Sequence, residues 1–260
     1  MKPINKYLII FLSLFLFAAC DFMDCNESDY YSKEQIQGSY ARVKQFVTNV
    51  YSYLPQDFCS IYGAMQDAAT DDAIHVYKTS NVQRFVNGTW SANTTIDDKF
   101  SNYYSGIHDA NFYLENMVGL TFEDWKYGDE YEDWMKEYEI RFLRAFFYFE
   151  LVKRYKNIPL ITKVVTKEEA NNAEPVAAGV ILDFIISECT EMAQLLPVSY
   201  TNFGKEQETG RVTKGVALAL KARAALYAAS PLFNPDNDKS KWIAAAEAAY
   251  EIIGNQSALG

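Results

Sequence analysis

Residues 134–162 read WMKEYEIRFLRAFFYFELVKRYKNIPLIT and carry a long helical pattern. Beginning one turn earlier, apolar or aromatic residues recur at alternating steps of four and three: Tyr131, Met135, Tyr138, Phe142, Ala145, Phe149 and Val152. This spacing places them on one face of an α-helix. Because Phe146, Phe147, Tyr148 and Leu151 widen that face, the helix needs cover on more than one side. We therefore expect a core helix with the other helices packed around it.

The ends and flanks of this helix are also marked in the sequence. Residues 134–155 would span about 33 Å as a helix. Basic residues gather at the C-terminal end, at Lys153, Arg154 and Lys156, where the helix dipole favours positive charge. Pro159 then ends the helix. Arg141 and Arg144 lie beside the apolar face.

Five further segments show a helical period, at residues 34–54, 95–117, 176–196, 213–230 and 240–253. Ser32 and Gln35 fit a capping box before the first of them, and Thr213 can cap the fourth. The fourth is rich in alanine, which lets a neighbouring helix approach closely. The predicted fold class is therefore mainly α, with tetratricopeptide-like antiparallel helix pairs and long irregular loops.

The connecting segments are polar. Residues 121–139 hold eight acids against Lys126 and Lys136, and we expect this acidic run only to solvate the first turns of the central helix. Gly119 is a suitable C-terminal break for the helix before it. After Pro159 we expect a short extended piece to residue 165 and then a polar loop to residue 174.

Composition bounds the class of function. The chain has 260 residues, 49% of them hydrophobic, and a formal net charge of −10. An acidic chain without a basic patch argues against a nucleic-acid partner. The two histidines, His75 and His108, are far apart, and the cysteines lack metal-site spacing, so neither a metal site nor another cofactor is predicted.

The N-terminus resembles that of a bacterial lipoprotein. Lys2 and Lys6 precede an apolar run over residues 7–19, which is too short to span a membrane and suits a secretory signal peptide. Residues 17–20, FAAC, resemble a lipobox, which implies cleavage before Cys20 and acylation of that cysteine. The alternatives are an ordinary signal peptide or an uncleaved anchor. If Cys20 is lipidated, Cys25, Cys59 and Cys189 can form at most one disulfide.

Residues 56–93 show no periodicity and form the longest predicted loop. Long ordered loops are uncommon and are often functional. Asp71 and Asp72 can ligate a metal or bind hydroxyl groups, although capping of a turn is the favoured interpretation. Trp90 can stack on a sugar ring, but pinning of the loop onto the core is favoured there.

Several motifs together resemble the SusD/RagB family of outer-membrane nutrient-binding lipoproteins. The specific blocks are RFLRAFFYF at residues 141–149, leading to Ile158-Pro159-Leu160, and GRVTKG at residues 210–215. Weaker matches are the lipobox with the acids that follow it, Asp71-Asp72, Gly88-Thr89-Trp90, Asp109-Ala110-Asn111 and Trp242 with its alanine-rich helix. The match covers the mature chain but only the N-terminal part of the family.

The resemblance implies a lipid-anchored protein of the cell outer membrane that faces the exterior. Residues 1–19 would be the signal peptide, residues 20–33 an acylated tether, and residues 34–260 a SusD-like helical domain. Because family members are usually about twice this length, we expect the domain to be truncated. The implied partners are a TonB-dependent, SusC-like transporter, an oligosaccharide or other nutrient, and the lipid bilayer.

Within this chain the irregular loop is the expected sugar site, and its candidate ligand-binding residues are Tyr77, Arg84, Trp90 and Asn93. Aromatic rings offer apolar area to sugar C–H faces at low entropic cost. The family is not enzymatic, so no catalytic residue is predicted. Two alternatives remain: a structural partner of the transporter without a ligand site, and a surface glycosidase. The glycosidase needs two facing carboxylates, whereas the adjacent pairs Asp71/Asp72 and Glu123/Asp124 diverge on regular backbone.

Overall fold

The computed structural model describes residues 31–56, 60–91, 93–120, 131–201 and 209–254, with the side chains of the central helix described from Lys136 onward. The predicted signal peptide, Cys20 and most of the tether lie outside these residues. The described part is mainly α-helical. Its β pairing is limited to isolated bridges, at Ile61–Ala64, Ser91–Thr94 and Ile158–Val176.

The predicted core helix is confirmed as α6 (Tyr131–Tyr155). It packs against α5 (Phe100–Asn116) and α8 (Ala178–Leu195). Side chains all around α6 are buried: Ile140, Phe142, Leu143, Ala145, Phe147, Tyr148, Phe149, Leu151 and Val152. Cover on more than one side is therefore confirmed, and the aromatic residues belong to the main core.

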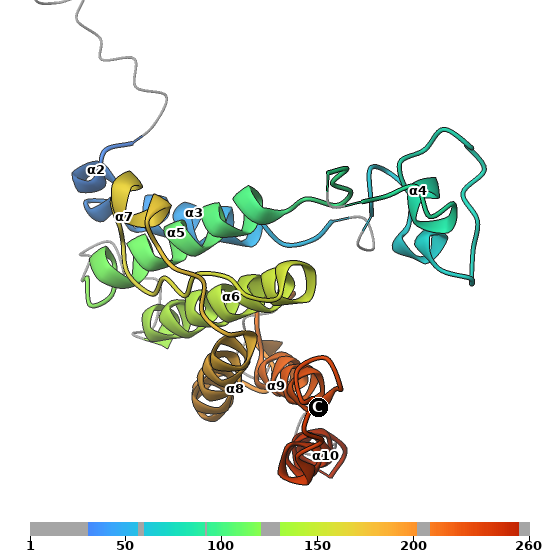
Figure 1. Cartoon of the computed structure of the whole chain (residues 1–260). Coiled ribbons are helices and arrows are strands. Elements are labelled where there is room, and N and C mark those ends of the chain that lie inside the picture. Colours follow the sequence, from blue (N-terminus) through green and yellow to red (C-terminus); the bar gives the residue numbers. More distant parts are fainter. Residues whose placement is uncertain (1–30, 57–59, 92, 121–130, 202–208, 255–260) are drawn as a thin grey trace, which may run out of the picture.

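Successive helices pack side by side in a curved row (Figure 1). α9 (Lys214–Ala229) packs on α8, and α10 (Lys239–Ile253) packs on α9. The close approach predicted for the alanine-rich segment is confirmed, because Ala225 and Ala229 of α9 form a small buried cluster with Ala245 and Ala248 of α10. α10 therefore packs on α9 at the end of the row, and only some of the helices pack directly on α6.

The first predicted helix is wrong as a single element. The chain forms α2 (Lys33–Gln37) and α3 (Tyr40–Tyr51), separated at Gly38 and Ser39. Ser39 has extended backbone angles, φ −146° and ψ 119°, so it starts a new helix instead of continuing the old one. The capping box of Ser32 and Gln35 is confirmed before α2. The polar loop predicted after residue 165 also differs, because it contains a short helix, α7 (Lys167–Asn171), which begins with a capping box of its own.

Other boundaries and faces also differ. α5 begins at Phe100 instead of residue 95, where a carboxylate oxygen of Asp98 accepts the Phe100 N–H. Thr213 precedes α9 but makes no side-chain cap. Several apolar residues of α8 and α10 are exposed, namely Leu195, Trp242, Ala249 and Ile253. Gly119 has a φ of 79°, a conformation that favours glycine, as expected for a C-terminal break.

The predicted irregular loop forms a lobe that projects beyond the helical body (Figure 1). It contains the 3₁₀-helix η2 (Gln66–Ala69) and the short helix α4 (Gln83–Val86). Its own small core consists of Ile61, Ala64, Ala68 and Val82, with Ala69, Phe85 and Ile96 packed against them. This core is separate from the main one.

The contact of Gly106 in α5 with Phe147 in α6 gives a stability prediction. A Cβ added to Gly106 would lie 2.7 Å from Cε2 of Phe147, whose side chain is fully buried. Gly106→Ala should therefore lower the free energy of unfolding by about 1 kcal/mol, because overpacking costs about 1–3 kcal/mol and exceeds the helix-propensity gain of about 1 kcal/mol. Urea unfolding followed by circular dichroism measures this change.

Gly179→Ala is the matched control, since a Cβ at Gly179 in α8 meets no atom within 4 Å. That variant should be as stable as the parent chain or slightly more stable. Equal unfolding midpoints for the two variants would contradict the close packing of α5 on α6.

Candidate functional site

The four residues predicted to bind sugar all lie on the lobe. Tyr77 is 72% exposed and Trp90 is 56% exposed, and Arg84 and Asn93 are also exposed. The lobe also exposes further large apolar side chains, namely Tyr62, Met65, Ile74, Val76 and Val86. The lobe therefore offers aromatic and polar groups together to solvent.

The Trp90 ring packs against another residue of the lobe and is still exposed to solvent. Its ring lies 5.8 Å from the ring of Phe85, measured between centroids. Arg84 precedes Phe85 on α4, and its carbonyl accepts the Thr89 N–H at 3.1 Å. The structure thus brings Trp90 next to the helix that carries Arg84.

Tyr77 stands apart from this pair. Its ring lies 5.5 Å from that of His75, and within the described residues no ring contact joins it to Trp90. Asn93 sits in a turn closed by the Ser91–Thr94 bridge. The four candidates therefore share one lobe without forming one enclosed pocket.

Asp71 and Asp72 follow η2 and are exposed. The turn here is instead held by Thr70, whose hydroxyl donates to the Asp67 carbonyl at 2.7 Å and accepts the Asp72 N–H at 3.2 Å. The two carboxylates make no hydrogen bond to a described residue, so the favoured capping interpretation is wrong for their side chains.

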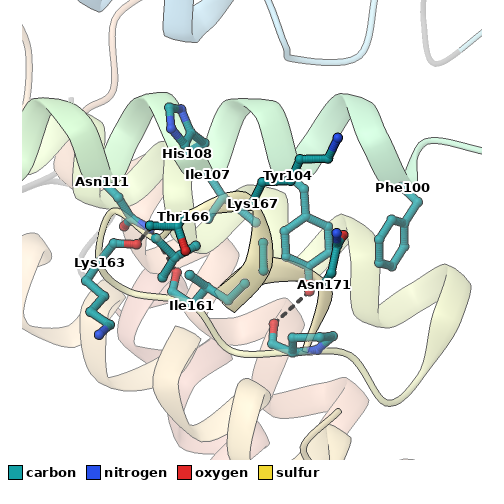
Figure 2. Close-up of a pocket in the computed structure, with 13 residues that line it drawn as sticks. Phe100, Tyr104, Ile107, His108, Asn111, Ile161, Lys163, Thr166, Lys167 and Asn171 are labelled. Carbon is teal, nitrogen blue, oxygen red and sulfur yellow. Dashed lines mark hydrogen bonds between the residues drawn. The ribbon is translucent and has the colours of Figure 1, made fainter. Parts of the chain in front are cut away.

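A second candidate, which sequence reasoning missed, is a pocket between α5 and the segment that runs from Pro159 into α7 (Figure 2). Its volume is about 440 Å³, within the range of small-molecule sites, about 300–1,000 Å³. Phe100 and Tyr104 form an aromatic wall with ring centroids 4.7 Å apart. The remaining lining residues are Ile107, His108, Asn111, Pro159, Ile161, Lys163, Val165, Thr166, Lys167, Ala170 and Asn171.

Hydrogen bonds fix the walls of this pocket. The Tyr104 hydroxyl donates to the Pro159 carbonyl at 2.7 Å, and burial, reinforced by Tyr148, raises the pKa of Tyr104. The Asn111 side chain donates to the carbonyls of Ile161 and Lys163, each at 3.0 Å. The residues Phe100, Tyr104, His108 and Asn111 follow steps of four, four and three in sequence, so their spacing on one helix face is the signal that could have found the pocket.

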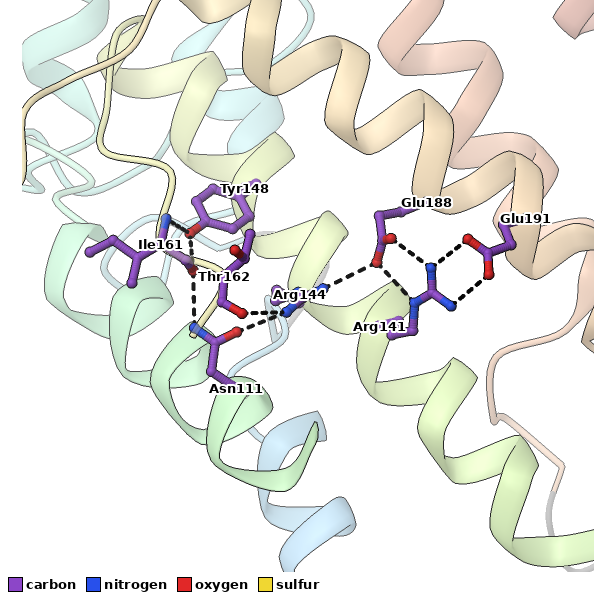
Figure 3. Close-up of polar contacts among 8 residues, drawn as sticks. All are labelled: Asn111, Arg141, Arg144, Tyr148, Ile161, Thr162, Glu188 and Glu191. Atoms are coloured by element: carbon purple, nitrogen blue, oxygen red, sulfur yellow. Dashed lines mark hydrogen bonds and ion pairs between the residues drawn. The ribbon is translucent and has the colours of Figure 1, made fainter. Parts of the chain in front are cut away.

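A partly buried polar network joins α5, α6 and α8 (Figure 3). Arg141 makes two hydrogen bonds to Glu188, at 3.1 and 2.7 Å, and two to Glu191, at 3.0 and 2.7 Å. These contacts raise the pKa of Arg141, with Glu191 contributing most. Arg144 donates to Asn111 at 2.9 Å and contacts Glu188 at 3.3 Å. Both arginines of the RFLRAFFYF block therefore fasten helices together.

Glu139 is the centre of another buried network, which corrects the expectation that the acidic run only solvates the helix. It is 2% exposed and pairs with Arg211 at 2.9 Å. The Tyr51 hydroxyl donates to it at 2.6 Å, and the Tyr200 hydroxyl lies 3.0 Å away. Burial, together with Glu139, raises the pKa of Tyr51 well above its ordinary value.

The described residues include one free cysteine and no cluster of metal-ligating side chains. Cys189 is free and buried, and burial raises the pKa of its thiol to about 12, so the thiol stays protonated near neutral pH. No group of three His, Cys, Asp or Glu side chains gathers there. Among the described helices, none has both the length and the apolar character of a membrane span.

Comparison with known families places the chain among SusD-like proteins. Residues 21–226 match the model of a SusD-like family, which is described as starch-binding and associating with the outer membrane. A SusD-like protein of Formosa agariphila is 26% identical over 237 residues, a match that covers 86% of this chain and 43% of the relative.

Solved structures agree in fold. A SusD-like protein from Bacteroides fragilis superposes with a TM-score of 0.66 at 27% identity, covering 84% of this chain and 38% of the other. A SusD-like carbohydrate-binding protein from the same species has a TM-score of 0.66 at 22% identity, covering 84% and 41%. This chain thus spans about two fifths of the length of these relatives.

Proposed function

The chain belongs to the SusD-like family of non-catalytic binding proteins, and on that premise we propose that it binds an oligosaccharide through the exposed residues of the lobe. The observation that carries this proposal is the half-exposed Trp90 ring, which packs on Phe85 of the helix that also carries the exposed Arg84. An aromatic face suits the C–H face of a sugar ring, and a guanidinium or amide group suits its hydroxyls. The name of the carbohydrate-binding protein with the same fold supports the same ligand class.

We further propose that the protein is anchored to the exterior of the outer membrane through acylated Cys20 and partners a TonB-dependent, SusC-like transporter. The lipobox-like FAAC sequence supports the anchor, because two or more acyl chains suffice for stable attachment. Mass spectrometry of Cys20 in the native protein tests the anchor, and co-purification of a TonB-dependent barrel tests the partnership.

The sugar site gives a direct prediction. Trp90→Ala should weaken the binding of its oligosaccharide about tenfold, because an aromatic contact of this kind contributes about 0.5–1.5 kcal/mol beyond its area burial. Isothermal titration of malto-, laminari- and galacto-oligosaccharides against the purified chain measures the affinity. A melting curve recorded on the same samples separates loss of binding from loss of folding.

Tyr250→Ala is the matched control, since Tyr250 is also an exposed aromatic residue, 72% exposed, on α10 and outside the lobe. It should leave affinity unchanged. If Trp90→Ala lowered only the melting temperature and left affinity intact, Trp90 would be a packing residue and the lobe site would fail. Absence of binding to all three oligosaccharide classes would favour a purely structural partner of the transporter.

A further inference from the structure

The pocket between α5 and α7 differs in charge from the rest of the protein. Its thirteen lining residues include Lys163, Lys167 and His108 but no aspartate or glutamate. The whole chain, by contrast, has a formal net charge of −10. A basic pocket on an acidic protein selects for an anionic ligand, because opposite charge raises its local concentration and like charge elsewhere repels it.

Three acidic side chains near the pocket, those of Glu169, Glu115 and Asp109, are engaged with backbone groups or with other side chains. Glu169 accepts the Thr166 N–H at 2.7 Å, and its other oxygen lies 3.9 Å from the Lys163 ammonium. Glu115 accepts the Val164 N–H at 2.7 Å. Asp109 accepts from the Tyr53 hydroxyl at 2.9 Å and lies 3.3 Å from His108. Among the described residues, Lys167 has no ion-pair partner, so its charge is available.

The shape of the pocket indicates a ring. Phe100 and Tyr104 present an aromatic wall, and Phe100 is 40% exposed. In Figure 2, Lys167 and Asn171 lie beside Tyr104, whereas Lys163 stands at the opposite end. A pyranose ring can lie against this wall, where Asn171 can bind its hydroxyls and a lysine its anionic group.

We infer that this pocket binds a sugar ring that carries an anionic group, either a carboxylate or a sulfate ester. The inference rests on the proposed glycan-binding function but concerns a site separate from the lobe. It would make the chain a receptor with one sugar contact on the lobe and a second contact, for an anionic group, beside α5. The ligand would then be an acidic glycan, which binds more weakly as salt screens the lysines.

Isothermal titration tests this with trigalacturonic acid, galactose 6-sulfate and neutral galactotriose, each at low and at physiological salt. At least one anionic sugar should bind the full chain, at least tenfold more tightly at low salt than at physiological salt. The anion that binds identifies the group. The double variant Lys163→Gln/Lys167→Gln should weaken its binding about tenfold, and Phe100→Ala should weaken it several-fold.

Lys239→Gln/Lys241→Gln is the matched control, because it removes the same charge from α10 and should leave affinity unchanged. Absence of binding by both anions, or equal affinity in the two lysine double variants, would overturn the inference. Either result would leave the lobe untouched, since the Trp90→Ala experiment with neutral oligosaccharides decides that site independently.

Discussion

Glu188→Ala should lower the free energy of unfolding by about 3 kcal/mol. The Glu188 side chain is only 12% exposed and contacts Arg141 and Arg144, which are 15% and 9% exposed. Removing one partner of a buried ion pair leaves a charge without compensation and costs about 3–5 kcal/mol. We choose the lower end because Glu191 still pairs with Arg141. In a domain of this size the melting temperature should fall by about 6–12 °C.

Glu191→Ala is the control for this prediction, because its side chain is 57% exposed although it contacts the same arginine. Solvent-exposed ion pairs contribute about 0–1 kcal/mol, so this variant should be nearly as stable as the parent chain. The hydrogen bonds from Arg141 lower the pKa of Glu191. Its small contribution is therefore present above the ordinary glutamate pKa and is lost as the pH falls through the lowered value.

Thermal and urea unfolding of the two variants, followed by circular dichroism, make the comparison. If Glu188→Ala and Glu191→Ala lowered the free energy of unfolding equally, burial would not determine how much each ion pair of this network stabilises the fold. The result bears on the RFLRAFFYF block as a whole. Its aromatic residues fill the core, and its two arginines connect α6 to the helices on either side.

The central helix could be predicted from sequence because its signal is local. Apolar residues at helical spacing between Phe142 and Val152 are all buried in the structure. The lobe could not be predicted in the same way, because its core joins small residues from Ile61 to Val82 without a regular period. The break at Gly38 was missed because the apolar spacing continues across it.

The polar networks and the second pocket were beyond sequence reasoning for a different physical reason. Arg141 meets Glu188 and Glu191 across 47 and 50 residues of sequence, and only the packing of α6 on α8 brings them together. The pocket likewise requires α5 to lie beside the segment that follows Pro159. The lobe residues were identified as candidates because exposure of polar and aromatic groups follows from the local composition of a long loop.

Glu139→Ala should be at least as damaging as Glu188→Ala, with a loss of about 4 kcal/mol. Glu139 is 2% exposed and joins α6 to the end of α3 through Tyr51 and to the segment before α9 through Arg211. Its removal leaves the Arg211 guanidinium, whose side chain is 15% exposed, without this carboxylate. It also takes the acceptor from the partly buried Tyr51 hydroxyl and leaves the buried Tyr200 hydroxyl with only the Val212 carbonyl, at 3.1 Å, and an unsatisfied group costs about 1–3 kcal/mol.

Glu137→Ala is the control within the same turn of α6, because Glu137 is only partly buried and makes no hydrogen bond or ion pair with a described residue. It should change the free energy of unfolding by less than about 0.5 kcal/mol. Tyr200→Phe, which removes one hydroxyl from the network, should fall between the two. Urea midpoints of the three variants rank these effects, and a Glu139→Ala chain as stable as Glu137→Ala would mean that Glu139 is solvated, as the acidic run alone suggested.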